Sequence, residues 1–212
     1  PVLAASGREV WSIDLPGFGR SLDPDGGRST LAHARACLAT LDALGVGRAH
    51  VVAWSMGGGV ALHMAELAPE RVASIALVAS IGVQESEGTG VHAAERIKYA
   101  ALRAGIELLD LGLPHFGRWS RGFEDARSFA RNFEESDQRA LRAILERLST
   151  PLLVLHGEAD VLASARAAQV SHELVEHSRL VLLDGNHFLP FTHLDELERE
   201  LVPFFERHDA AG

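Results

Sequence analysis

The 212-residue chain has few of the residues that build disulfides or membrane spans. Its one cysteine, Cys37, cannot form an internal disulfide and fits a reducing compartment. Cys37 falls in an amphipathic stretch of helical periodicity, which favours a packed, inert thiol over a nucleophile. No apolar run reaches membrane-spanning length, and no signal peptide opens the chain. We therefore expect a cytoplasmic protein with no membrane segment in this chain.

Positive charge is also scarce, because 20 lysine and arginine residues stand against 29 aspartate and glutamate residues. The resulting net charge of −9 argues against nucleic acid or an anionic membrane as the main partner. No H-x-x-x-H or H-E-x-x-H spacing occurs, so the sequence predicts no metal site. The hydrophobic content of 47% suits one globular domain with a sizeable core. A small molecule is the expected partner, and the oligomeric state is left open.

The most informative stretch places a serine at a sharp turn between a strand and a helix. An apolar run ends at Ala53, Ser55 stands at the apex, and Gly57 opens a helical pattern that continues to Ala68. This context exposes a serine hydroxyl and strains its backbone, so the residues two positions away on either side must be small. Ala53 and Gly57 meet that need. The backbone N–H of Met56 is then placed to hold an oxyanion.

This turn has a second interpretation, in which the serine is incidental to an ordinary strand–helix connection. Glycine-rich turns of this kind also cradle phosphates at a helix N-terminus. The lysine of a P-loop is absent, however, and no G-x-G-x-x-G follows a strand. The choice between the two interpretations depends on the rest of the chain.

Several apolar runs lack the alternation of a half-exposed strand, which is typical of parallel strands covered by helices on both faces. We expect strands at 9–13, 51–53, 74–78, 152–155 and 180–183. Helical stretches alternate with them, so the predicted class is α/β, a mostly parallel sheet with helices on both faces. Between 82 and 149 the alternation lapses into helical stretches near 91–110, 122–133 and 137–148. This predicts a small all-helical cap at 82–149, inserted into a core formed by 1–81 and 150–212.

The predicted cap is rich in aromatic side chains, and two explanations stay open for them. They can form the cap's own small core, or face Ser55 and line an apolar substrate pocket. The residues concerned are Tyr99, Phe116, Trp119, Phe123, Phe129 and Phe133. For substrate binding we single out Phe116 and Trp119, together with Trp54 and Phe188 of the core.

Three residues of complementary chemistry each follow a predicted parallel strand: Ser55, Asp160 and His187. A serine hydroxyl is a poor nucleophile without a base, and the base needs a group that orients it. The carboxyl ends of parallel strands share one edge of the sheet, where ligand crevices form. The chain order Ser, Asp, His is the order that this architecture requires. The sequence therefore predicts a catalytic triad at this edge.

Other residues compete for two of these roles. Glu158 lies close to Asp160 and is the alternative acid, and His193 is the alternative base among 11 histidines. Asp14 is a third acid, which we expect to be structural and to tie the loop at 17–21.

With these residues assembled, the chain resembles the α/β-hydrolase superfamily. The motifs that carry the likeness span most of the chain: DLPGFGRS at 14–21, WSMGG at 54–58, LHGEAD at 155–160 and GNHF at 185–188. The resemblance implies Ser55 as nucleophile, Asp160 as acid and His187 as base. A serine at the elbow is unlike haloalkane dehalogenases and epoxide hydrolases, which place an aspartate there. The chain looks more similar to carboxylesterases, lactonases and the carbon–carbon bond hydrolases of aromatic degradation.

The chain departs from the superfamily at its beginning. Members normally have three further strands before the one expected at 9–13, and a His-Gly motif after the third supplies a second oxyanion N–H. The pair His156-Gly157 belongs to the acid strand and does not correspond to that motif. We therefore expect an N-terminally truncated fold, either a fragment or a shortened member. The second oxyanion donor is expected N-terminal to this chain.

The resulting hypothesis is a cofactor-independent serine hydrolase that cleaves an ester or similar acyl bond of a small, largely apolar substrate. Carbon–carbon bond hydrolysis or perhydrolysis on the same fold is the first alternative. A non-catalytic binding protein or an inactive fragment is the second.

Overall fold

A computed structural model describes residues 2–21, 28–112 and 120–209. Its centre is a four-stranded sheet whose order follows the sequence and whose neighbouring strands are all parallel. The strands are β1 (Ala49–Trp54), β2 (Val72–Val78), β3 (Leu152–Gly157) and β4 (Arg179–Leu183). This confirms the α/β class and the parallel strands expected from the apolar runs.

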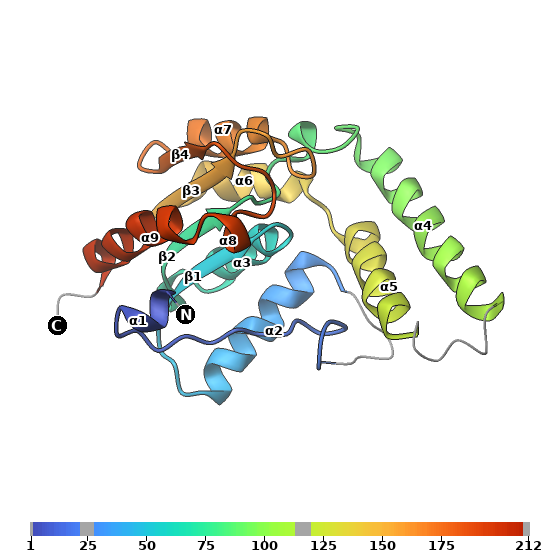
Figure 1. Ribbon diagram of the computed structural model, residues 1–212, viewed down its shortest axis with the longest axis horizontal. Helices are drawn as coiled ribbons and strands as arrows, with labels where there is room; N and C mark the ends of the chain where they lie inside the picture. Colours follow the sequence, from blue (N-terminus) through green and yellow to red (C-terminus); the bar gives the residue numbers. More distant parts are fainter. Residues whose placement is uncertain (1, 22–27, 113–119, 210–212) are drawn as a thin grey trace.

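Helices cover both faces of the sheet (Figure 1). One face carries α2 (Thr30–Ala43), α3 (Gly57–Leu67), α6 (Arg139–Arg147) and α7 (Ala165–Leu174). The other face carries α9 (Leu194–His208), with the short helices α1 (Val2–Ala5) and α8 (Leu189–Thr192) beside it. Two single-turn 3₁₀ helices, η1 (Pro69–Arg71) and η2 (Gln84–Ser86), stand at either end of β2.

The two central strands show why their sequences are apolar without alternation. Every residue of β2 and of β3 is buried. Ile75 and Leu77 enter one core cluster with α3, while Ala76 and Val78 enter a second cluster with α9. Because successive side chains point to opposite faces, a strand covered on both sides is apolar at nearly every position.

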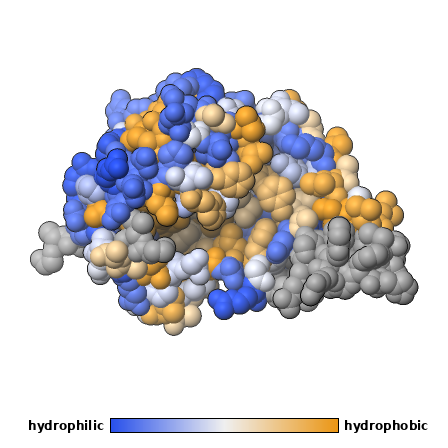
Figure 2. All heavy atoms as spheres, in the orientation of Figure 1, coloured by the Kyte–Doolittle hydropathy of each residue, from blue (hydrophilic) through white to orange (hydrophobic). Residues whose placement is uncertain are grey.

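The remaining helices, α4 (His92–Gly112) and α5 (Ser120–Glu135), pack against each other and lie to one side of the sheet in Figure 1. An ion pair of 2.7 Å between Arg103 and Glu134 joins them. α6 then returns to the core and packs against α3 and α7. On the face shown in Figure 2, hydrophobic side chains gather over α4, where Ile97 and Leu108 are both 71% exposed. None of the described helices is both long and apolar enough to cross a bilayer.

The strand expected at 9–13 is wrong. This segment is extended but joins no ladder in the described part of the chain, and the sheet ends at β1. Val10 and Trp11 are 52% and 40% exposed, so the segment does not bury the apolar side chains that suggested a strand. A strand is stable when its backbone groups pair with a neighbour and one face is covered, and here neither condition holds.

Candidate active site

Ser55 stands at the turn between β1 and α3 with φ of +54°, a left-handed conformation that non-glycine residues seldom adopt. Its backbone is held on both sides, because its N–H donates to the carbonyl of Val78 at 3.1 Å and its carbonyl accepts from Ile81 at 3.1 Å. Strain of this kind persists only where the surroundings over-determine it. Here the neighbouring strand β2 and the loop after it supply that constraint.

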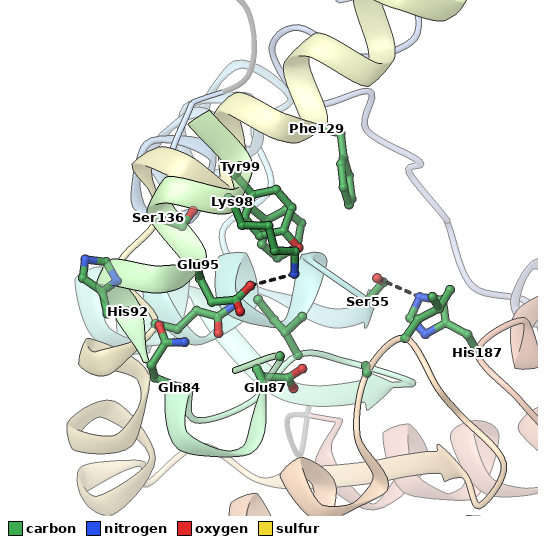
Figure 3. Close-up of a pocket in the computed structure, with 16 residues that line it drawn as sticks. Ser55, Gln84, Glu87, His92, Glu95, Lys98, Tyr99, Phe129, Ser136 and His187 are labelled. Atoms are coloured by element: carbon green, nitrogen blue, oxygen red, sulfur yellow. Dashed lines mark hydrogen bonds and ion pairs between the residues drawn. The ribbon is translucent and has the colours of Figure 1, made fainter. Parts of the chain in front are cut away.

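The structure brings the three predicted residues into one hydrogen-bonded chain. His187 Nε2 lies 2.9 Å from Ser55 Oγ, and His187 Nδ1 lies 2.8 Å from Asp160 Oδ2. Ser55 follows β1, Asp160 follows β3 and His187 follows β4. All three therefore meet at the carboxyl edge of the sheet, which is the edge that the sequence indicated. Figure 3 shows the Ser55 hydroxyl pointing at the imidazole of His187.

The carboxylate of Asp160 is fully buried, and both of its oxygens have hydrogen-bond partners. Its Oδ1 accepts the backbone N–H groups of Leu162 at 2.8 Å and Ala163 at 2.9 Å, which leaves Oδ2 for His187. The competing acid Glu158 is exposed. The turn after β3 thus directs the carboxylate of Asp160, and not that of Glu158, at the imidazole of His187.

The other competing residues have local partners. His193 donates from Nε2 to the carbonyl of Asp184 at 3.0 Å and contacts Thr192 Oγ1 at 2.7 Å, so it braces its own turn. Asp14 accepts the backbone N–H of Arg20 at 3.1 Å and ties the loop at 17–21, as expected.

His156 was not expected at the site, yet it lies directly behind the acid. It is fully buried on β3, and its Nε2 is 3.3 Å from Asp160 Oδ2 and 3.0 Å from the carbonyl of Ala163. Burial lowers the pKa of His156, which favours a neutral ring that donates from Nε2. The sequence signal was a histidine four residues before Asp160 in the same motif.

Trp54 and Phe188, predicted to bind substrate, lie against His187. The indole N–H of Trp54 donates to the backbone carbonyl of His187 at 2.8 Å, and the ring centroids of Trp54 and Phe188 are 6.3 Å apart. Neither residue is among the described residues that line the cavity beside Ser55. Phe116 and Trp119 lie outside the described residues.

A cavity of about 210 Å³ lies beside Ser55 and His187. Its apolar lining consists of Ile81, Tyr99, Phe129, Phe133, Leu162 and Ala163. Its polar lining consists of Gln84, Glu87, Gly88, His92, Glu95, Lys98, Ser136 and Gln138. Figure 3 shows His92, Gln84 and Ser136 on the side of the view away from Ser55 and His187.

The three aromatic side chains that α4 and α5 contribute to this lining also contact one another. Tyr99 stacks on Phe133 with ring centroids 4.9 Å apart, and Phe129 is 4.9 Å from Phe133. They therefore form the small aromatic core between α4 and α5 and at the same time line the cavity.

Sequence reasoning missed the polar wall. Lys98 and Glu95 on α4 form an ion pair of 2.8 Å, and Glu87 lies in the loop before this helix. The sequence did not indicate this wall, because local periodicity does not show which way the side chains of a loop point.

The described residues contain no group of three or more histidine, cysteine, aspartate or glutamate side chains arranged to hold a metal ion. Cys37 is buried in the core on α2, and burial raises the pKa of its thiol to about 11. The thiol therefore stays protonated near neutral pH.

Gly157 links the fold to the site and yields a testable prediction. A Cβ at this position would lie 2.4 Å from the carbonyl oxygen of Gly185 and 2.8 Å from that of Asn186, in the loop that carries His187. Gly157→Ala is therefore expected to destabilise the fold by about 1–3 kcal/mol and to lower any catalytic rate that depends on His187 by displacing its imidazole. Chemical unfolding and initial rates measure both effects.

The matched control is Gly47→Ala, because a Cβ there would meet no atom within 4 Å. That variant is expected to unfold at the wild-type denaturant concentration. A Gly157→Ala variant with the same unfolding midpoint and rate as the wild type would contradict the packing described here.

Comparison with known proteins agrees with this fold. The family model for the alpha/beta hydrolase fold matches residues 1–100. A pimeloyl-[acyl-carrier protein] methyl ester esterase of Nitrosomonas europaea is 30% identical over 215 residues, which cover 87% of this chain and 79% of that protein. The chain belongs to the alpha/beta hydrolase family. The relatives that it matches include hydrolases.

Two further relatives are similar over nearly the whole chain. The dihydrolipoyllysine-residue acetyltransferase component of an acetoin cleaving system of Pseudomonas putida is 31% identical over 98% of this chain. The chain spans only 59% of that protein's length. A 2-hydroxymuconate semialdehyde hydrolase of Pseudomonas putida is 28% identical, covering 96% of this chain and 79% of that protein.

Solved structures share the fold. A hydrolase from Pseudomonas aeruginosa PA01 superposes with a TM-score of 0.71 at 26% identity, covering 90% of this chain and 77% of that one.

Proposed function

We propose that this chain is a serine hydrolase that cleaves an ester or similar acyl bond of a small, largely apolar substrate. The observation that carries the proposal is the hydrogen-bonded chain from Ser55 through His187 to Asp160, which opens onto a cavity. A nucleophile, a base and an orienting acid in this geometry are what acyl transfer to serine requires.

The proposed reaction proceeds through an acyl-enzyme. Asp160 holds His187 with its proton on Nδ1, so Nε2 accepts the proton of Ser55 as Oγ attacks the substrate carbonyl. The protonated imidazole then donates that proton to the leaving alcohol as the carbon–oxygen bond breaks. Water, deprotonated by the same imidazole, attacks the acyl-enzyme and releases the carboxylic acid together with free Ser55.

Met56 is the proposed oxyanion donor. It is the N-cap residue of α3, and its backbone N–H donates no hydrogen bond within the described part of the chain. The first turn of a helix carries partial positive charge, which stabilises the negative oxygen of a tetrahedral intermediate.

The cavity supports the proposed size and polarity of the substrate. We assign residues 82–149 as an insertion into a core of 1–81 and 150–212. Its helices α4 and α5 form the cap over the core, while α6 packs on α3 and α7. In this arrangement α4 and α5 supply Tyr99 and Phe129, and the core supplies Ile81 and Leu162. A volume of about 210 Å³ with these walls fits a short acyl chain.

The test is hydrolysis of p-nitrophenyl esters of increasing acyl length, with mass spectrometry of the quenched enzyme. We expect saturable turnover that declines once the acyl chain exceeds the cavity, and an acyl adduct on the peptide that contains Ser55. Absence of both turnover and adduct in the folded protein would contradict the proposal and favour a non-catalytic binding role.

Carbon–carbon bond hydrolysis is the second candidate, favoured by the similarity to a 2-hydroxymuconate semialdehyde hydrolase. Turnover of that semialdehyde faster than of any ester would replace ester hydrolysis as the primary activity. Adding hydrogen peroxide to the ester assay tests perhydrolysis by the same acyl-enzyme.

A further inference from the structure

Glu87 is an acid on the wall of the cavity that the proposed reaction does not use. The residue is 8% exposed, and its Oε1 accepts the backbone N–H of Gly82 at 3.1 Å. No ion pair reaches it in the part of the chain that the structure describes, and the cation on the same wall, Lys98, is paired with Glu95. Figure 3 shows its carboxyl group on the same cavity as Ser55.

The negatively charged groups around Glu87 disfavour ionisation of its carboxyl group. Burial is the largest cause that raises the pKa of Glu87, and the negative charges of Asp160 and Glu95 add to it. Together they raise this pKa to about 7, against the opposing effect of the backbone N–H groups of Gly82 and Ser164. At and below neutral pH a large share of this carboxyl therefore keeps its proton and can act as a donor.

Other charged side chains on the helices near Glu87 either form ion pairs with other residues or line the same cavity. Arg142 of α6 pairs with the exposed Glu85, and Arg166 of α7 pairs with Glu173. The titratable groups that share the cavity with Glu87 are His92, Glu95, Lys98, Tyr99 and His187.

We propose that the Glu87 carboxyl donates a hydrogen bond to an oxygen of the substrate's acyl chain, so that preferred substrates carry a neutral carbonyl or ether oxygen beyond the scissile bond. Oε1 accepts the N–H of Gly82, so we place the proton of the neutral carboxyl group on Oε2. An anionic acyl chain is disfavoured, because it would face the carboxylate of Glu95 while Lys98 is already paired. This inference rests on the proposed function and names the substrate class of the same site.

The experiment compares p-nitrophenyl esters of matched length: pentanoate with 4-oxopentanoate and hemisuccinate, and hexanoate with 5-oxohexanoate. Each kcat/KM is divided by the hydroxide-catalysed rate of the same ester to remove intrinsic reactivity. We expect a keto ester to exceed its unsubstituted partner by about 3- to 10-fold at about pH 6, the range of one neutral hydrogen bond. The hemisuccinate is expected to fall below pentanoate.

The pH dependence of that ratio identifies the donor. Glu87 loses its proton as the pH rises through about 7, so the keto preference is expected to fall towards unity in more alkaline buffer. Glu87→Gln retains an N–H donor, so it is expected to keep the preference and lose its pH dependence. Glu87→Met is expected to lose the preference at every pH.

Glu85→Gln is the matched control, because Glu85 is an exposed neighbour that pairs with Arg142, and the ratio should be unchanged. The wild-type pH series decides the matter even if a Glu87 variant fails to fold. Absence of a keto preference for both chain lengths, or a preference that does not change with pH, would overturn the inference.

Failure of the proposed function gives a different pattern, in which no ester is hydrolysed at all. Calorimetric binding of methyl 4-oxopentanoate and methyl pentanoate to Ser55→Ala then tests the Glu87 contact without turnover. Tighter binding of the keto ester supports it, and equal binding overturns it.

Discussion

Asp160→Asn is expected to lower kcat for ester hydrolysis by about 10⁴-fold while the protein stays folded. Asparagine keeps an oxygen for the N–H groups of Leu162 and Ala163, so the turn after β3 is preserved. Its amide nitrogen then faces His187 Nδ1 where Oδ2 stood at 2.8 Å. Because an amide N–H₂ only donates, the imidazole must accept at Nδ1 and carry its proton on Nε2. In that tautomer it cannot take the proton of Ser55.

Glu158→Gln is the control for this prediction. Glu158 is exposed, so its neutralisation is expected to change kcat by less than about 2-fold. Steady-state kinetics and a thermal unfolding curve on both variants separate a catalytic loss from a folding defect. A nearly normal Asp160→Asn variant beside an impaired Glu158→Gln variant would transfer the acid role to Glu158.

His187→Gln is expected to lower kcat by at least about 10⁴-fold, since glutamine has no group that can accept and return a proton near neutral pH. Steady-state rates of both proteins measure the loss, and a thermal unfolding curve of the variant shows whether it is still folded.

His193→Gln is the matched control, because His193 braces its own turn through Asp184 and Thr192. It is expected to retain wild-type kcat within a few-fold. A large loss in His193→Gln with a small one in His187→Gln would contradict the assignment of the base.

The sheet was predictable because strands that are buried on both faces have sequences that are almost entirely apolar. β2 and β3 are apolar at nearly every position, and the residues that follow β1, β3 and β4 reach one edge by topology alone. The segment at 9–13 also contains apolar residues, but it pairs with no strand in the part of the chain that the structure describes. Composition indicates that a segment can be buried, but it does not show whether a neighbouring strand is present to pair with it.

The residues of the cavity wall were less predictable than the hydrogen-bonded residues Ser55, His187 and Asp160. Ser55, Asp160 and His187 are positioned by the strands that precede them, whereas Glu87 and Lys98 are positioned by the way one helix pair sits beside the core. Trp54 adjoins the nucleophile in sequence, yet its indole turns to the carbonyl of His187. Contacts of this kind depend on tertiary packing, which a single sequence does not specify locally.

The most direct measurement is labelling of the folded chain by a fluorophosphonate probe, with Ser55→Ala as control. The probe phosphonylates a serine only when a base has activated its hydroxyl, so it reports the Ser55–His187 pair without assuming a substrate. Our account predicts rapid labelling of the wild type, none of Ser55→Ala, and strongly slowed labelling of Asp160→Asn. No labelling of a folded wild-type chain, or labelling that persists in Ser55→Ala, would contradict it.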